Sequence, residues 1–227
     1  MKKHFSKIGR VGFVHSEVED YAAAMSASES EIRGNLALET LKKFPKEAAM
    51  MIGPLEAALL QTLLLIANAT NVLEIGTFTG YSALAMREVL PANGKIWTFE
   101  VCAKHAEVAE DYFKWANAAD GAQITLQQVD AHSIPWPADA GTEYPLFDVA
   151  FIDAEKEGYI DYWEKCKSHV GTGGIIIADN TLSHLRKKGS DSAGKAIREF
   201  NEYVATDGTV HSVLTPIRDG MTIGYVK

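Results

Sequence analysis

Short apolar runs alternate with amphipathic stretches along most of this chain, and this alternation limits the folds that it can adopt. The runs are rich in β-branched and aromatic residues, and most are followed by a segment with helical periodicity. The apolar runs span Asn71–Ile75, Lys95–Glu100, Gln123–Val129, Phe147–Asp153 and Gly174–Asp179. The helical segments span Tyr81–Leu90, Ala103–Ala118, Tyr159–Val170 and Ala193–Ala205. Such alternation predicts an α/β fold with a doubly wound, mostly parallel sheet.

Both ends of the chain depart from this alternation. Two final strand-like pieces, Val210–Pro216 and Met221–Val226, flank a turn at Asp219–Gly220 and predict an antiparallel hairpin, which brings the sheet to seven strands. Before the first strand, Val18–Phe44 and Pro54–Ala67 have helical periodicity but are too few residues for a separate domain. We therefore expect one domain over residues 1–227, with a helical cover at 1–70 over the ligand-binding edge of a Rossmann-like core at 71–227.

Composition argues against several classes of partner and compartment. The chain has 30 acidic and 22 basic residues and a formal charge of -8, which makes a nucleic-acid partner unlikely because such binding needs phosphate neutralisation. Cys102 and Cys166 have no CxxC or histidine-rich neighbour, so we expect packed thiols. We find no apolar run long enough for a signal peptide or a bilayer span, and we expect a cytoplasmic protein without membrane contact.

The first predicted strand leads into a turn with the pattern E-x-G-x-x-x-G, formed by Glu74, Gly76 and Gly80. A dinucleotide-binding turn would have G-x-G-x-x-G instead. Here Glu74 would repel a phosphate but could face a cationic amino group. Gly76 would allow close backbone approach, and Ser82 could hydrogen-bond a carboxylate near the helix start. An ordinary glycine-rich turn is the alternative for this motif taken alone.

The next two strand ends carry further candidates for a nucleoside site. Glu100 ends the second predicted strand, a position from which a carboxylate can accept both hydroxyls of a ribose. Ala131 follows the third strand, where a small side chain and the backbone could meet the edge of an adenine. A solvated strand-end glutamate is the alternative for Glu100.

Acidic and amide side chains end the following two strands. Asp153 ends one, and Asp179 and Asn180 end the next. If these strands are neighbours, roughly 4.8 Å apart, the three side chains converge at one edge of the sheet. Hard oxygen ligands with open positions suit magnesium, manganese or calcium and exclude a tetrahedral sulfur–nitrogen zinc site. Each residue taken alone could instead be a helix cap or a turn former.

Together these residues resemble the class I S-adenosylmethionine-dependent methyltransferases. The closer resemblance is to the cation-dependent O-methyltransferases related to caffeoyl-CoA and catechol O-methyltransferases, and it runs from about Met50 to the C-terminus. It implies donor contacts at Met50, Ile52, Glu74, Gly76, Thr77, Ser82, Glu100, Ala131 and Asp153. It also implies metal ligands at Asp153, Asp179 and Asn180, which match the family's spacing between the two aspartates.

The chain departs from this family at three places. The stretch Leu55–Leu60 differs from the usual E-G-Q-F-L, which leaves the role of that helix open. The usual D-A-D-K becomes Asp-Ala-Glu-Lys at residues 153–156, which adds one methylene. In the loop that usually touches the acceptor, where relatives commonly have a tryptophan, His184 is a candidate substrate contact, with a surface histidine as the alternative. The basic residues 186–188 either form a solvated loop or attract an acidic acceptor.

The expected chemistry needs both a cation and a base. A phenol with a pKa of about 10 is a poor nucleophile at neutral pH, and chelation stabilises a catecholate anion. Lys156 aligns with the family's usual general base, a role that burial and an adjacent cation can give to a lysine. A solvated lysine between Glu155 and Glu157 is the alternative.

These features lead us to expect an S-adenosylmethionine- and divalent-cation-dependent O-methyltransferase for catechol-like or hydroxycinnamoyl-type small molecules. The resemblance implies a homodimer. A tRNA hydroxyuridine O-methyltransferase is the alternative, disfavoured by the acidic composition but left open by the basic residues near Lys187. A non-catalytic donor-binding protein would be expected to lose Asp153, Asp179 or Asn180, and all three are present. The absent G-x-G-x-x-G pattern disfavours a nicotinamide-dependent oxidoreductase.

Overall fold

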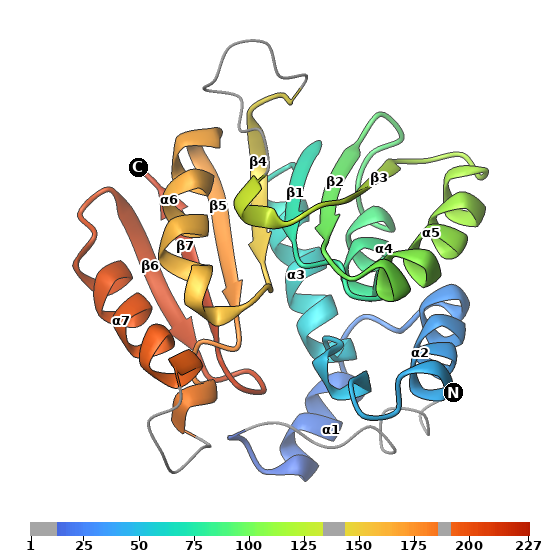
Figure 1. Ribbon diagram of the computed structural model, residues 1–227, viewed down its shortest axis with the longest axis horizontal. Coiled ribbons are helices and arrows are strands. Elements are labelled where there is room, and N and C mark those ends of the chain that lie inside the picture. Colours follow the sequence, from blue (N-terminus) through green and yellow to red (C-terminus); the bar gives the residue numbers. More distant parts are fainter. Residues whose placement is uncertain (1–12, 134–143, 186–191) are drawn as a thin grey trace.

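A computed structural model describes residues 13–133, 144–185 and 192–227 of the chain. Seven strands form one sheet in the order β3-β2-β1-β4-β5-β7-β6. Strands β1 to β5 run parallel, and β7 pairs antiparallel with both β5 and β6. Helices cover both faces of the sheet (Figure 1). The predicted doubly wound sheet with a closing hairpin is therefore confirmed.

The elements have the following bounds. The strands are β1 (Asn71–Ile75), β2 (Lys95–Glu100), β3 (Gln123–Gln128), β4 (Phe147–Ile152), β5 (Val170–Asp179), β6 (Val210–Thr215) and β7 (Met221–Val226). The α-helices are α1 (Ser16–Ala24), α2 (Glu31–Lys43), α3 (Pro54–Ile66), α4 (Tyr81–Arg87), α5 (Ala103–Asn117), α6 (Tyr159–His169) and α7 (Ser192–Thr206). Short 3₁₀ helices are η2 (Ala48–Met50), η3 (Ala131–Ser133), η4 (Lys156–Gly158) and η5 (Ser183–Leu185).

Two predicted boundaries differ from the structure for local reasons. Strand β5 begins at Val170 rather than at Gly174, because the glycine-rich start of the strand stays extended and pairs with Phe147 across a register shift. The segment Val18–Phe44 forms two helices, because the small polar residues before α2 end the first one. Ser30 then caps α2 by accepting the backbone N–H of Arg33 at 3.4 Å.

Two hydrophobic cores lie on opposite faces of the sheet. Along β4, Val149 and Phe151 contribute to one core, and Ala150 and Ile152 contribute to the other. Because both faces are buried, such strands appear in the sequence as continuous apolar runs rather than as alternating ones. Cys166 is buried in the second core, Cys102 is half-buried, and both thiols are free.

One stretch corrects the expectation that no segment approaches a bilayer-spanning length. Ala48–Ile66 has 19 residues with a mean hydropathy of 1.7, so it is long and apolar enough to qualify among the described residues. Half of the stretch is buried inside the protein, with Leu60 and Leu64 enclosed in the first core. Helix α3 itself spans about 20 Å, less than the roughly 30 Å of a bilayer interior. We therefore interpret it as a core helix.

The N-terminal helices lie toward the carboxyl ends of the parallel strands (Figure 1). Thr40 of α2 shares a hydrogen bond of 2.8 Å with Thr79, in the loop after β1. Arg33 of α2 forms an ion pair of 3.0 Å with Glu88, which follows α4. These contacts hold α2 against the edge of the sheet at which ligands bind in α/β folds.

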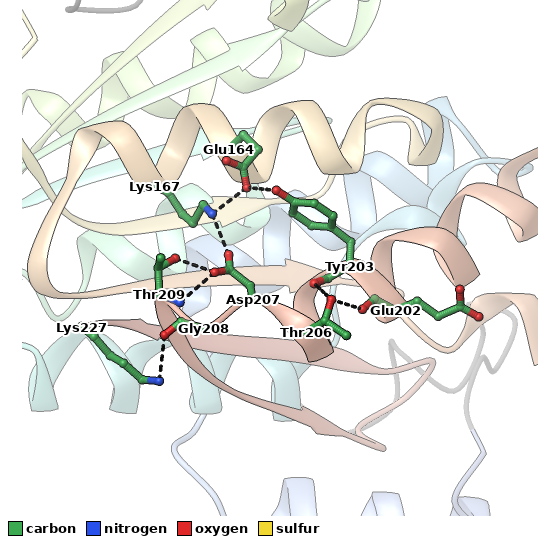
Figure 2. A network of polar contacts seen from close by, with 9 residues as sticks. All are labelled: Glu164, Lys167, Glu202, Tyr203, Thr206, Asp207, Gly208, Thr209 and Lys227. Carbon is green, nitrogen blue, oxygen red and sulfur yellow. Dashed lines mark hydrogen bonds and ion pairs between the residues drawn. The ribbon is translucent and has the colours of Figure 1, made fainter.

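A polar network joins α6 and α7 to the start of β6 (Figure 2). Lys167 of α6 donates to Asp207 at 2.6 Å and pairs with Glu164 at 2.7 Å. Thr209 donates its backbone N–H to Asp207 at 2.8 Å and its hydroxyl at 2.6 Å. Burial opposes ionisation of Asp207, but the hydrogen bonds from Lys167 and Thr209 outweigh it and lower the pKa of Asp207 to about 2.

We predict that Asp207→Asn lowers the free energy of unfolding by about 1–3 kcal/mol at pH 7, because it removes charge-assisted hydrogen bonds. A carboxylate whose pKa is depressed by folding contributes stability above its unfolded pKa. For Asp207 this contribution should fade as the pH falls from 3.8 toward 2. Urea unfolding should therefore show a smaller difference between Asp207→Asn and the parent at low pH than at pH 7.

The matched control is Asp111→Asn on α5, whose carboxylate is 69% exposed and lies 3.8 Å from Lys114. It should change stability by no more than about 0.5 kcal/mol at either pH. A difference for Asp207→Asn that does not depend on pH would contradict the assigned ion pair.

Candidate functional site

A cleft of about 840 Å³ opens at the carboxyl ends of the parallel strands. The loops that follow β1, β2, β3, β4 and β5 line it, together with η2 and the turn between β6 and β7. Its volume lies within the range of small-molecule sites, roughly 300–1,000 Å³. The position is the one that an open α/β sheet offers to a ligand.

Gly76 brings the loop after β1 against the end of β4. Its φ angle is 98°, and a Cβ atom at this position would lie 2.2 Å from the carbonyl oxygen of Asp153. The backbone N–H of Asp153 donates to the carbonyl of Ile75 at 2.8 Å. The close backbone approach expected at Gly76 is therefore an approach to the backbone of Asp153. Gly76 and Asp153 both line the cleft.

Glu74, Thr77 and Ser82 lie behind the wall of the cleft. The two carboxylate oxygens of Glu74 accept hydrogen bonds from the hydroxyls of Ser82 and Thr98, and Thr77 hydrogen-bonds to Thr98 at 2.5 Å. Burial raises the pKa of Glu74 to about 8, although these hydroxyls oppose the shift. In the structure these three residues shape the loop after β1. Their predicted contact with S-adenosylmethionine stays a prediction.

Glu100 lines the cleft and is held by backbone donors. Its Oε2 accepts the N–H of Phe78 at 2.7 Å, and its Oε1 accepts the N–H of Cys102 at 2.8 Å. A carboxylate oxygen has about two lone-pair positions, so each oxygen keeps one for a further donor. The geometry fits a group that presents two neighbouring hydroxyls.

Three other predicted donor contacts divide between the cleft and the core. Ala131 begins η3 and lines the cleft beside Val129. Met50 also lines the cleft, and its side chain is exposed. Ile52 is buried in the first core and is not part of the cleft lining.

The three predicted metal ligands follow two neighbouring strands. Strands β4 and β5 are neighbours, and Ile152 pairs with Ala178, so Asp153 and Asp179 follow side by side. Asn180 has a φ of 59°, a left-handed conformation that asparagine tolerates, and its backbone N–H donates to Asp179 at 2.7 Å. The expectation that the two strands are neighbours is confirmed, and the role of the three residues as metal ligands stays a prediction.

Sequence reasoning missed three residues that complete this region. The carboxylate oxygens of Glu56 on α3, Asp179 and Asp219 in the β6–β7 turn lie within 4.8 Å of one another. Arg218 donates to Glu56 at 2.6 Å and to the carbonyl of Met51 at 2.9 Å. A lone glutamate in an otherwise apolar helix and an Arg-Asp pair in a hairpin turn were the signals available in the sequence.

The acidic cluster, which we define as Glu56, Asp153, Asp179 and Asp219, consists of three buried carboxylates and the half-buried Asp153, which lines the cleft. Burial raises the pKa of Asp179 well above its usual value, and the nearby carboxylates of Glu56, Asp153 and Asp219 raise it further. Burial also raises the pKa of Glu56 to about 7, against the opposing effect of Arg218. Arg218 opposes the rise in pKa at Glu56, and Lys156 opposes it at Asp153 and Asp179.

Lys156 connects this cluster to the cleft. Its Nζ donates to Asp153 at 3.2 Å and to the hydroxyl of Tyr159 at 2.5 Å, and that hydroxyl donates to the carbonyl of Asp179 at 3.0 Å. The Lys156 side chain is 18% exposed and lines the cleft. It is therefore fixed in position rather than solvated in a loop.

His184 also lines the cleft, together with Ser183 and Gly194. Its Nδ1 is buried and has no hydrogen-bond partner among the described residues. Burial, together with the charge of Arg198, lowers the pKa of His184. It stays a candidate substrate contact, whereas residues 186–188 lie outside the described part of the chain.

Comparisons with known proteins agree on one family. Residues 23–226 match the model of the family described as O-methyltransferase. The caffeoyl-CoA O-methyltransferase of Populus kitakamiensis is 31% identical over 93% of this chain and 94% of its own length. The catechol O-methyltransferase of Niastella koreensis is 31% identical over 79% of this chain and 83% of its own length. An O-methyltransferase structure from Bacillus cereus in complex with SAH is 26% identical, with a TM-score of 0.79 over 93% of this chain and 97% of that one.

We predict that Gly76→Ala destabilises the protein by about 2–4 kcal/mol, because it combines a positive φ with a backbone clash. The clashing atom is the carbonyl oxygen of Asp153, so the variant should also disturb the cleft. Gly208→Ala is the matched control, since an added Cβ there meets nothing within 4 Å, and its stability should stay within about 1 kcal/mol of the parent. Equal denaturation midpoints for the two variants would contradict the close approach.

Proposed function

The chain belongs to the O-methyltransferase family, and from that premise we propose that it methylates a hydroxyl group of a catechol-like or hydroxycinnamoyl-type small molecule with the help of a divalent cation. It is an S-adenosylmethionine-dependent O-methyltransferase of the caffeoyl-CoA and catechol type. The observation that carries the proposal is the convergence of three buried carboxylates, those of Glu56, Asp179 and Asp219, beside a cleft that Glu100 and Lys156 line.

The donor half of the proposed site is formed by the loops after β1, β2 and β3. The free lone pairs of Glu100 support a contact with the two ribose hydroxyls, and Ala131 and Met50 offer small and apolar surface for the adenine side. When bound, S-adenosylmethionine supplies an electrophilic methyl group. The residues of the chain orient the reacting groups and exclude water from them.

The acidic cluster supports a divalent cation. Its donors are hard oxygens, and Oε1 of Glu56 is buried without a hydrogen-bond partner in the described structure, so this oxygen has one contact left to make. We propose Asp153, Asp179 and Asn180 as the ligands. Of these, Asp179 belongs to the group of carboxylates within 4.8 Å of one another and Asp153 does not; Glu56 and Asp219, the other members of that group, add negative charge. When bound, magnesium, manganese or calcium favours the ionised form of an acceptor hydroxyl.

Lys156 is the proposed general base. Its Nζ faces the cleft and is held by Asp153 and Tyr159, so it meets the geometric requirement for accepting a proton from a bound hydroxyl. Burial raises the pKa of Tyr159, as do the nearby aspartates, so this phenol stays neutral and serves as a fixed hydrogen-bond partner. His184, which also lines the cleft, is the proposed acceptor contact.

We also propose that the enzyme is a cytoplasmic homodimer. Helix α1 exposes Val18, Tyr21 and Met25 at spacings that place them on one helix face. An apolar face of this kind is a surface that a second copy of the chain could cover.

Removal of divalent cations should abolish methyl transfer, and magnesium or manganese should restore it. The measurement is transfer to catechols and hydroxycinnamoyl thioesters, with undermodified tRNA as the alternative acceptor, before and after chelation. Calorimetry with Mn²⁺ should show binding by the parent and by Asp161→Asn, an exposed control on α6, but at least tenfold weaker binding by Asp179→Asn, by about 1.4 kcal/mol or more. Full activity after verified metal removal would refute the cation's role.

Lys156→Met should lower kcat by on the order of 10²–10⁴-fold while donor affinity stays nearly intact, because the proton acceptor is lost and the donor site is not. Raising the pH, or using an acceptor with electron-withdrawing substituents, should recover part of the loss. Lys114→Met on α5, with a 71% exposed side chain, is the control. If kcat falls by about tenfold or less, and if the decrease does not depend on the pKa of the acceptor hydroxyl, the cation alone activates the hydroxyl.

A further inference from the structure

His105, in the first turn of α5, lies in the wall of the cleft and was not singled out by the sequence. Its side chain is 11% exposed. The ring stands edge-on to two phenylalanines, with centroids 4.9 Å from Phe44 and 4.6 Å from Phe78. His105 is therefore held between the end of α2 and the loop after β1.

Carboxylates flank both nitrogens of this ring. Nε2 lies 2.8 Å from Oε2 of Glu47, and Nδ1 lies 3.7 Å from Oε1 of Glu100. Because an ionised carboxylate only accepts hydrogen bonds, Nε2 donates to Glu47. The distance to Glu100 exceeds a hydrogen bond, so the ring restricts that carboxylate by packing.

Glu47 extends the contact to another wall of the cleft. It immediately precedes η2, in which Ala49 and Met50 line the cleft. Its own backbone N–H donates to the carbonyl of Phe44 at 3.0 Å. One imidazole thus joins η2, the loop after β1 and the end of β2.

We propose that His105 is a positioning residue for the donor: it holds Glu100 and the Ala49–Met50 wall in the arrangement that binds the ribose and adenine of S-adenosylmethionine. The inference rests on the proposed donor site. It differs from a purely structural role for a packed histidine, because it requires donor affinity to depend on the bond between His105 and Glu47.

The test is calorimetric titration of the full chain with S-adenosylhomocysteine. His105→Ala and Glu47→Ala should each raise the Kd by about 5- to 20-fold, and the double variant should be no weaker than the weaker single variant, because both remove one bond. Glu47→Gln keeps an oxygen that accepts from Nε2, so its Kd should stay within about threefold of the parent. His211→Ala, an exposed histidine on β6, is the matched control.

Further measurements separate positioning from folding. Glu47 is 48% exposed, so Glu47→Ala should keep the thermal midpoint of the parent. In both single variants the donor KM should rise by a larger factor than kcat falls. When Glu100 is already alanine, His105→Ala should cost less in affinity than it does in the parent, because only the Ala49–Met50 wall is then left for it to hold.

The outcomes are distinguishable. If the variants lose stability but bind S-adenosylhomocysteine as the parent does, or if the effects of Glu47→Ala and His105→Ala add, the positioning role is overturned and the proposed function stands. If the parent chain itself does not bind S-adenosylhomocysteine, the donor site assigned under the proposed function fails, and the role of His105 fails with it.

Discussion

The close approach of two backbone segments at Gly76 is the constraint on which the site depends. Strands β1 and β4 are neighbours at the point where the order of the sheet reverses, and the loops after them leave in different directions. Gly76 lies so close to the Asp153 carbonyl that a Cβ atom has no room. Because one loop leads to Glu100 through Phe78 and the other begins the acidic cluster, this contact sets how the two halves of the cleft face each other.

Most of the fold could be predicted because burial on both faces of a parallel sheet leaves continuous apolar runs in the sequence. The prediction failed where local chemistry masks that signal, as at the glycine-rich start of β5 and at the break between α1 and α2. For the site, adjacency of strand ends was enough to bring Asp153 and Asp179 together. The adjacency of strand ends could not reveal Glu56 and Asp219, because these residues lie on a helix and in a hairpin turn. The periodicity of the strands does not predict the position of either element.

Glu74 shows why a motif identifies a loop better than it identifies a contact. From its position before Gly76 the sequence predicts an acid that faces a ligand, yet both of its oxygens accept hydroxyls inside the protein. A carboxylate whose pKa is raised by burial is one that the fold has removed from solvent. Glu100 differs because its partners are backbone N–H groups at the rim of the cleft, which fix the carboxylate and leave lone pairs free.

The buried charges near the cleft explain why α3 belongs to the site as well as to the core. Arg218 reaches from the hairpin to Glu56 and to the carbonyl of Met51, so the closing hairpin and the segment before α3 are joined across the ligand edge. Such a buried pair is a poor source of stability, because desolvating both ions offsets their attraction. The pair fixes geometry instead: it joins the η2 segment, which contains Met50, to the hairpin turn that carries Asp219. The Ala49–Met50 wall and the acidic cluster are therefore linked through Arg218. We expect a substitution in one of them to alter the geometry of the other.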